Sequence, residues 1–225
     1  MELYYVRLFT LIIIMFFSFS NHASAMKYIA SGEQISSPLI LSYYGDYLGF
    51  KPGIHIGIDR PVLVIRKHNA ATGNIFPRVE RTLLTSYNFI IYHHTGYNTS
   101  MQLFPALVFR SIRSHGLILD MQIGTGISRT FLDGPTYSVR NNGSVKKVNA
   151  AGSWYWTASA APSVGWDLLR ISRKLSFQLF LSPDIWMQYP YNKGALFHFS
   201  AQVGVRSDII NLLSKKVKIY TRRQF

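Results

Sequence analysis

Two residues of this chain have the types and the spacing for acid–base chemistry: a histidine and a serine two positions apart, in His198-Phe199-Ser200. Side chains at positions i and i+2 of a β-strand share a face, so the imidazole and the hydroxyl could meet as base and nucleophile. This pair supports a hydrolase hypothesis with Ser200 as the nucleophile and His198 as the base. A thiol nucleophile is excluded because the chain contains no cysteine.

The sequence does not indicate a metal or cofactor site. The lack of cysteine also excludes thiolate zinc sites and disulfide scaffolds. His68, His93 and His94 lack carboxylate companions at the spacing that metal ligands need. No predicted helix follows Gly124-x-Gly126, so this pair is not expected to form a phosphate-binding loop. We therefore expect neither a metal nor a cofactor.

The elements that would position these side chains are strands, because apolar and polar residues alternate along most of the chain. In the segment 197–206, for example, Phe197, Phe199 and Val203 fall on one face, and His198 and Gln202 on the other. A period of two is typical of a strand with one apolar and one polar face. Eight such segments are expected, at 39–49, 53–59, 81–93, 101–112, 117–128, 157–169, 175–182 and 197–206.

The polar faces of these segments carry Gly, Ser, Gln, Asn, Asp and His, with little Lys and almost no Glu. This composition favours the lining of a narrow closed barrel over the water-facing side of a soluble sandwich. Buried charges must be paired, so we expect a hydrogen-bonded plug in which Asp59 or Asp120 meets Arg206. A proton or ion relay is the alternative. The expected interior residues are His55, Asp59, Asp120, Gln122, Asp167, Gln178, His198, Gln202 and Arg206.

The apolar faces would then contact lipid, and the predicted fold class is all-β, a closed antiparallel transmembrane β-barrel of eight strands. Most of the segments have the length of membrane-spanning strands. Tyr and Trp prefer the boundary between membrane and water. The aromatics expected at the two rims are Tyr43, Tyr44, Tyr47, Tyr92, Trp154, Tyr155, Trp156, Trp186, Tyr189 and Tyr191. A periplasmic sandwich or a lipid-binding barrel is the soluble alternative.

The first 25 residues predict export. Arg7 precedes an apolar stretch that is too short to span a membrane, and Ala23-Ser24-Ala25 fits signal peptidase cleavage after Ala25. We expect a signal peptide at 1–25, an N-terminal lead at 26–38, the barrel at 39–208 and a basic tail at 209–225. After Ala25 no apolar run reaches the length of a transmembrane helix.

The predicted connections differ in length. Short turns are expected at 51–53, 94–98, 114–116 and 170–174, and long connections at 132–156 and 183–195. An outer-membrane barrel alternates tight periplasmic turns with longer outside loops. The stretch 66–80 is long where this scheme needs a short turn, so its side of the membrane stays open.

The composition limits the partners. The 225 residues are 48% hydrophobic and 15% charged, with 24 Lys plus Arg against 10 Asp plus Glu and a formal net charge of +14. Basic groups such as Arg78, Arg140, Lys146 and Lys147 suit anionic membrane surfaces. Export argues against nucleic acid, which is the usual partner of a chain this basic.

The signal peptide, the alternating strands and the terminal aromatic Phe225 resemble the small outer-membrane β-barrel proteins of Gram-negative envelopes, a porin-like class. The resemblance covers nearly the whole mature chain. It implies an outer-membrane location, contact with outer-membrane lipid and lipopolysaccharide, and insertion by the barrel-assembly machinery. Eight strands leave too little room for a solute pore. We expect a structural or envelope-interaction role without catalysis.

The His198-x-Ser200 pair is similar to that of outer-membrane lipid A deacylases, which are also small barrels. The resemblance implies Ser200 as the nucleophile and His198 as the base. In that family an Asn follows the Ser directly, where this chain has Ala201, and an acidic residue some dozen positions on is absent here. A lipid A hydrolase is therefore the alternative function.

Overall fold

The computed structural model describes residues 29–35, 37–46, 51–69, 76–141, 143–172, 175–192, 194–207 and 215–224. The predicted signal peptide with its cleavage after Ala25, and the terminal Phe225, lie outside these residues. Among the residues that the structure describes, strands dominate and the single helical element is the short 3-10 helix Leu168–Arg170. No helix among them is long and apolar enough to cross a membrane. The predicted all-β class is confirmed.

The described residues contain twelve strands, and seven of the eight predicted strands are longer than expected. Most positions of the longer ones alternate between buried and exposed side chains. Their bounds are β1 Ile29–Ile35, β2 Leu39–Asp46, β3 Lys51–Asn69, β4 Val79–His94, β5 Asn98–Arg113, β6 Leu117–Leu132, β7 Thr136–Val139, β8 Val145–Val148, β9 Trp154–Asp167, β10 Phe177–Tyr191, β11 Gly194–Ser207 and β12 Lys215–Gln224.

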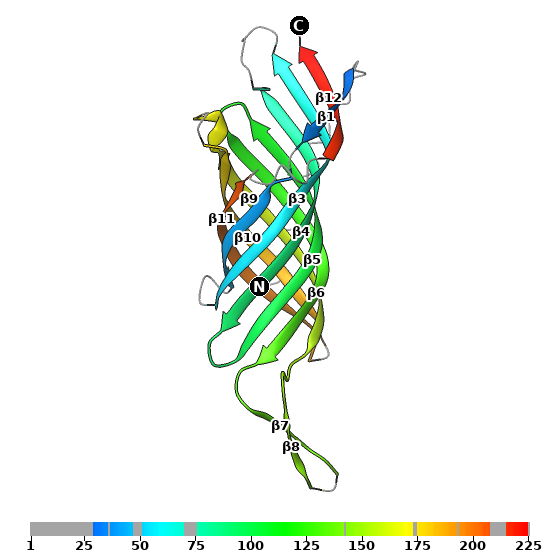
Figure 1. Cartoon of the computed structure of the whole chain (residues 1–225), viewed down its shortest axis with the longest axis vertical. Coiled ribbons are helices and arrows are strands. Elements are labelled where there is room, and N and C mark those ends of the chain that lie inside the picture. Colours follow the sequence, from blue (N-terminus) through cyan, green and yellow to red (C-terminus); the bar gives the residue numbers. More distant parts are fainter. Residues whose placement is uncertain are drawn as a thin grey trace, which may run out of the picture.

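Eight of these strands close into a ring. The order β3-β2-β11-β10-β9-β6-β5-β4 returns to β3 through the β3–β4 pairing, and all eight neighbouring pairs are antiparallel. These are the eight segments that alternate in the sequence, so the expectation of an eight-stranded closed sheet is confirmed. Figure 1 shows the strands running obliquely around the ring, with β7 and β8 beyond one end and β1 and β12 at the other.

Strand β3 is longer than its neighbour β2 and changes partner halfway. Its first half, up to Ile58, pairs with β2, and its second half, from Leu63, pairs with β12 in parallel. Pro61 lies between the two halves, at a register shift towards β4. Proline cannot donate a ladder hydrogen bond and is tolerated at such a bulge. β12 therefore continues the sheet where β2 is absent, and β1 extends it by one strand.

Two predicted connections are wrong. The stretch 183–195 is mostly strand, because β10 continues to Tyr191. The pairing of β10 with β9 pauses around Pro183, between Leu181 and Ile185, while the pairing with β11 continues through Pro183 and Ala201. The turn predicted at 51–53 is also wrong, because these residues begin β3.

Other connections agree with the sequence, and the two ends of the chain differ from it. Tight turns at 95–97 and 114–116 join β4 to β5 and β5 to β6. The long connection at 132–156 contains the hairpin of β7 and β8. Residues 170–174 and 66–80 fall only partly within the described residues. The predicted lead contains β1, and the predicted basic tail contains β12.

Candidate functional site: the lining and the outer face of the ring

Four charged side chains meet inside the ring and form what we call the charged quartet: Asp59, Arg110, Asp120 and Arg206. They come from β3, β5, β6 and β11, and their side chains are at most 6% exposed. Arg110 Nη2 lies 2.7 Å from Asp59 Oδ2, and its Nε lies 3.1 Å from Asp120 Oδ1. Arg206 Nη1 lies 2.9 Å from Asp120 Oδ2. Two carboxylates face two guanidinium groups, so the quartet is neutral as a whole.

The quartet is covered on one side by an aromatic ring. The guanidinium carbon of Arg206 lies 4.1 Å from the centre of the Phe180 ring, which is within cation–π distance. Phe180 breaks the alternation of the predicted strand 175–182, because it is apolar yet points to the polar face. The contact with Arg206 explains the exception.

A neutral hydrogen-bonded network lies beside the quartet, around His55. Its Nδ1 is 3.0 Å from the Ser42 hydroxyl, and its Nε2 is 2.9 Å from Asn88 Oδ1. Ser42 in turn lies 3.4 Å from Gln202 Oε1, and the Ser86 hydroxyl donates to Asn88 Oδ1. Both ring nitrogens of His55 are therefore occupied by uncharged partners.

A second network surrounds His198 nearer the end that carries the hairpin. His198 Nδ1 is 3.3 Å from Asp46 Oδ2, and Nε2 is 3.2 Å from Gln188 Oε1. Lys51 Nζ lies 3.2 Å from the same Asp46 oxygen, and Gln188 donates to the Ser128 hydroxyl. The His198 ring stacks on the Trp186 indole, with the ring centres 3.8 Å apart. These contacts hold the imidazole on both edges and on one face.

Ser200 shares the inner face with His198 but is not joined to it by a hydrogen bond among those that the structure gives. Its side chain is 5% exposed, and in the sheet register it lies directly opposite Asp184 of β10. Both His198 nitrogens are engaged with Asp46 and Gln188 instead. The arrangement therefore does not form the base–nucleophile pair that the spacing suggested, and Ser200 has no access to a large substrate.

The remaining predicted interior residues divide between the middle of the ring and one end. Gln122 and Gln178 are partly buried, whereas Gln202 is 5% exposed. Asp167 is buried at the end of β9 and forms an ion pair with Arg170 at 3.2 Å. Arg170 also donates to the backbone carbonyls of Pro77 and Arg113, so it ties three connections together at the end of the ring that carries β12.

Three of the predicted rim aromatics lie inside the ring instead. Tyr44, Tyr92 and Trp186 are at most 3% exposed and pack together with Ile90 and Phe104 in one apolar cluster. Their rim placement is a wrong prediction, because each stands at an inward position of its strand. Tyr47 lies outside the described residues, and Tyr155 is partly buried. The remaining predicted rim residues are exposed: Tyr43, Trp154, Trp156, Tyr189 and Tyr191.

The lining leaves almost no free volume. The cavity beside the quartet has a volume of about 10 Å³, room for about one water molecule, and is lined by His55, Asp120, Gln202 and Arg206 among others. No group of His, Asp and Glu among the described residues has the arrangement of a metal site. This cavity therefore has no room for a solute larger than a water molecule.

The predicted interior residues do not include three members of these networks, Asp46, Arg110 and Gln188, or the buried Asp184 opposite Ser200. Arg110 follows Phe109 on β5, and extending the alternation of that strand by one position places it inside. Asp184 and Gln188 fall in the predicted connection 183–195, whereas β10 continues to Tyr191. The period-two signal was present in both cases.

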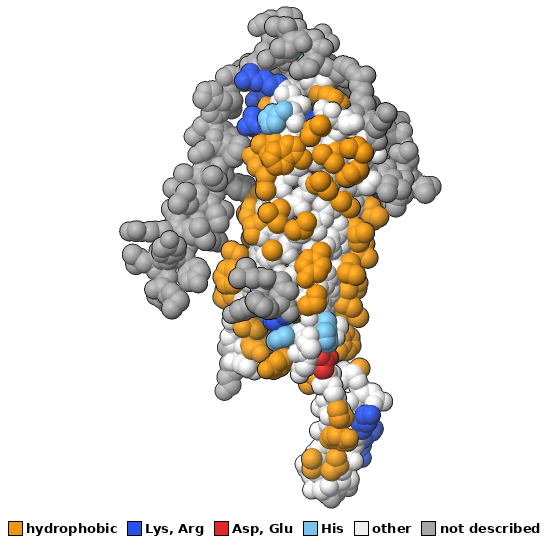
Figure 2. All heavy atoms as spheres, turned by 90° about the vertical axis from the view of Figure 1, so that its left-hand side faces the viewer, with side chains coloured by type: hydrophobic (Ala, Val, Ile, Leu, Met, Phe, Trp, Pro, Cys, Tyr) orange, Lys and Arg blue, Asp and Glu red, His pale blue; other side chains and the backbone are white. Residues whose placement is uncertain are grey.

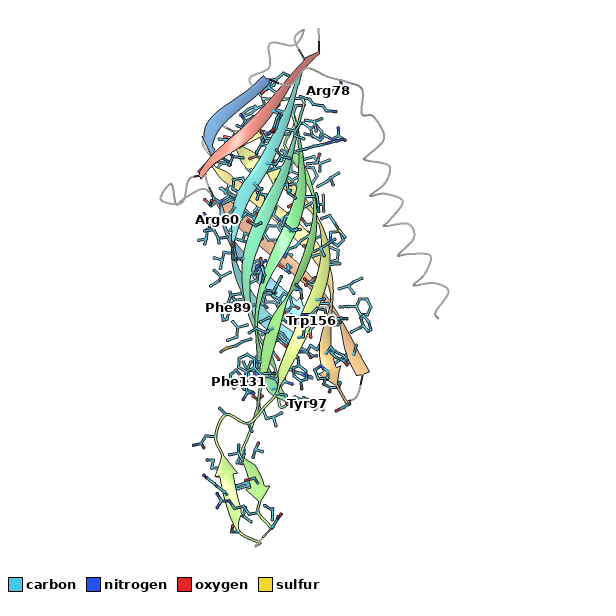
Figure 3. All side chains as sticks on the ribbon, turned by 90° about the vertical axis from the view of Figure 1, so that its right-hand side faces the viewer. Arg60, Arg78, Phe89, Tyr97, Phe131 and Trp156 are labelled. Carbon is cyan, nitrogen blue, oxygen red and sulfur yellow. The ribbon has the colours of Figure 1, made fainter. Side chains whose placement is uncertain are left out.

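The outer face of the ring is apolar. Leu103, Leu107, Ile123, Leu181 and Val203 all point outward, with exposed fractions of 48–58%. Figure 2 shows hydrophobic side chains over the length of the ring, whereas charged and histidine side chains gather towards its two ends. In Figure 3, Phe89 and Trp156 stand outward from the ring, Phe131 and Tyr97 lie near the hairpin, and Arg78 lies towards the opposite end.

The comparisons with known proteins add no relative. No family model, no curated protein and no solved structure matches the chain. The class is therefore defined by geometry alone: a closed ring of eight antiparallel strands with a charged, filled interior and an apolar exterior.

Proposed function

We propose that the ring is a β-barrel embedded in the outer membrane, and that the protein has a structural or envelope-interaction role without catalysis. One observation carries the proposal: the polar and the apolar side chains are distributed in the reverse of the order found in a water-soluble protein. The quartet and the His55 and His198 networks are buried, while the large aliphatic side chains of the same strands are exposed.

This reversal argues against a soluble sandwich or a soluble lipid-binding barrel. Soluble monomers rarely expose contiguous apolar patches larger than a few hundred Å². A soluble lipid carrier would place its apolar side chains inside a cavity, yet the interior here is charged and filled. Hydrocarbon around the ring would account for the apolar outer face and for the polar, charged interior.

The apolar part of β5 has the length that a membrane requires. On β5 the outward positions are apolar from Met101 to Phe109 and become polar at Thr99 and Ser111. This matches the roughly 9–11 residues with which a tilted strand crosses the hydrocarbon core. Closure of the ring also leaves no unpaired strand edge within that core, as a membrane demands.

Large aromatic side chains mark one edge of the apolar band. Trp154 and Trp156 of β9 and Tyr189 of β10 point outward with exposed fractions of 46–62%. Trp156 and Tyr189 are direct neighbours in the register. Trp and Tyr side chains are enriched at the boundary between lipid and water, so this edge supports the proposed depth of the ring.

Location is tested by fractionating cells that express the full chain. The expected result is recovery in the outer-membrane fraction and extraction only with detergent. Recovery in the aqueous phase without detergent would overturn the membrane proposal. A soluble protein of the same mass that is secreted by the same route serves as the control for fraction purity.

The rival hydrolase is tested separately at Ser200. Ser200→Ala removes the only nucleophile of the His-x-Ser pair while preserving the volume of the lining to within one oxygen atom. We expect identical lipid A acylation, measured by mass spectrometry, in cells that carry the wild-type protein, the variant or no protein. A loss of one acyl chain that requires Ser200 would establish the hydrolase and refute the non-catalytic role.

A further inference from the structure

The hairpin of β7 and β8 is separate from the ring. The two strands form a sheet of their own, in which Val139 pairs with Val145 and Tyr137 pairs with Lys147. Figure 1 shows the hairpin projecting from the end of the ring opposite to β12. An isolated two-stranded hairpin is only marginally stable in water, because it has too little apolar surface to bury. A partner that covers it would stabilise it.

The hairpin exposes apolar side chains on one face. Tyr137, Val139 and Val145 are 57%, 72% and 63% exposed. Residues opposite one another in an antiparallel pair share a face, so these three side chains lie together with Lys147. Figure 2 shows hydrophobic side chains along the hairpin with basic ones beside them.

The hairpin is also purely basic. It carries Arg140, Lys146 and Lys147, and the sequence has no Asp or Glu between Asp133 and Asp167. All three basic residues are exposed, and their charged groups have no ion-pair partner within the part of the chain that the structure describes. In the register, Lys147 lies on the face of Tyr137 and Val139, whereas Lys146, opposite Ser138, lies on the other face. A hairpin with uncompensated cations and exposed apolar side chains fits ligands that are both anionic and amphiphilic.

The root of the hairpin is held to the ring, so the hairpin is presented in a defined direction. Arg129 of β6 donates to the carbonyls of Ala150 and Gly152, and its guanidinium carbon lies 5.3 Å from the Trp154 ring centre. The Leu132 amide donates to the Ala151 carbonyl at 2.8 Å. These contacts attach the hairpin to the ring close to Trp154, at the aromatic edge of the apolar band.

We propose that the hairpin binds the phosphorylated saccharide of lipopolysaccharide in the leaflet around the ring. This proposal rests on the proposed outer-membrane location. The first and last ring strands, β2 and β11, begin and end at the end opposite to the hairpin, so a chain exported into the periplasm and inserted from there presents the hairpin on the outer side. Phosphates of the surrounding molecules pair with the basic side chains Arg140, Lys146 and Lys147, which are not confined to one face of the hairpin. The face that carries Tyr137, Val139, Val145 and Lys147 lies against the lipid and sugar of these molecules.

The test uses the full chain in detergent micelles and purified lipopolysaccharide that retains its core phosphates. The triple variant R140Q/K146Q/K147Q is expected to bind at least tenfold more weakly than wild type, and to lose the salt dependence of binding, because salt screens ion pairs at exposed sites. The matched control is R60Q/R78Q/R113Q, which removes the same charge at the opposite end and should bind as wild type does. Equal binding by the two triple variants would overturn the proposal.

A second experiment removes the phosphates from the lipopolysaccharide and leaves the basic residues of the protein unchanged. Dephosphorylated lipopolysaccharide should bind wild type as weakly as the intact form binds the hairpin variant. Equal affinity for both forms would overturn the proposal, as would tighter binding of an acidic peptide such as polyglutamate, which would identify a protein partner instead. Circular dichroism of each variant checks that the ring remains folded.

A further titration distinguishes an error in the hairpin inference from an error in the membrane proposal. Soluble phosphorylated core oligosaccharide, free of lipid, is titrated into the same proteins. If the chain fractionates as aqueous but still binds this oligosaccharide through Lys146 and Lys147, the membrane proposal fails and the ligand class stands. If it fractionates with the membrane and the oligosaccharide does not bind, only the inference about the hairpin is wrong.

Discussion

At the scale of single residues, the charged quartet shows how a narrow ring tolerates ions in its centre. Moving a charge out of water costs several kcal/mol, and only a close partner with good geometry offsets this cost. Arg110 contacts both Asp59 and Asp120, so it bridges the two carboxylates. Arg206 completes the balance at Asp120 and stacks on Phe180. The four side chains can be buried because their charges sum to zero, and no single ion pair accounts for this.

Removing one member of the quartet should therefore be costly. Arg110→Met leaves two buried carboxylates with one guanidinium and should destabilise the ring by about 3–5 kcal/mol. The measurement is urea unfolding in detergent micelles, followed by circular dichroism. Arg78→Gln, which removes an exposed cation, is the control and should change stability by less than about 0.5 kcal/mol.

Restoring neutrality should recover part of the loss. The double variant Arg110→Met with Asp59→Asn carries one carboxylate and one guanidinium, and we expect it to be more stable than Arg110→Met alone. The double-mutant cycle gives the coupling free energy. Additive effects of the two substitutions would show that the two side chains do not interact.

At the scale of elements, two prolines lie where the pairing of a strand with its neighbour changes or pauses, and the strand continues past each of them. Pro61 marks the place where β3 exchanges β2 for β12 as its partner, and Pro183 lies at a pause in the ladder between β10 and β9. Packing supports the exchange on β3. Val64 of β3 and Val217 and Ile219 of β12 form a buried cluster, each at most 3% exposed. β12 is therefore held by apolar contact as well as by backbone hydrogen bonds.

A charge in that cluster should release β12 and leave the ring intact. Ile219→Asp places an unpaired carboxylate at a site that is 0% exposed. We expect hydrogen–deuterium exchange to lose protection over 215–224 while β5 and β6 keep theirs. Exchange in β5 that rises together with β12 would mean that the two form one cooperative unit. Ile219→Val is the conservative control.

At the scale of the whole molecule, the exterior decides between lipid and water as the surroundings. Leu107 of β5 points outward near the middle of the apolar band, and Thr99 points outward at its edge on the same strand. A charged side chain on the lipid face is costly at the midplane and nearly neutral near the interface. In water the two positions would be equivalent.

A pair of arginine substitutions tests this difference. Leu107→Arg should cost about 2–4 kcal/mol in lipid bilayers, and Thr99→Arg about 0–1 kcal/mol. Stability is measured by reversible denaturant unfolding in liposomes. Equal small effects at the two depths would count against hydrocarbon around the ring.

Much of the fold could be predicted from the sequence because alternation is local. The eight ring strands and the inward placement of His55, Asp59, Gln202 and Arg206 follow from which side of its strand each residue takes. Register and strand ends could not be predicted so simply. The continuation of β10 past Pro183 goes with its uninterrupted pairing with β11, and the parallel docking of β12 on β3 depends on contacts between distant segments. Tyr44, Tyr92 and Trp186 were misplaced because residue type was weighed above face.

The contacts around His198 could not be predicted either. The spacing of His198 and Ser200 puts both side chains on one face, as the structure shows. Their partners come from other strands: Asp46 from β2 and Gln188 from β10. Spacing along one strand does not contain that information, so a motif of three residues indicated a chemistry that the neighbouring strands do not support.

The shortness of β2 has a consequence for biogenesis. β2 is an 8-residue strand, and it closes the ring by pairing with β11, the last ring strand to be synthesised. The other seven pairings join ring strands that follow one another along the chain, whereas the pairing of β2 with β11 brings Leu39 next to Ser207. The ring therefore cannot close until the chain has been synthesised through residue 207. Until then the sheet has two unpaired edge strands, and a chaperone that binds the chain must cover them.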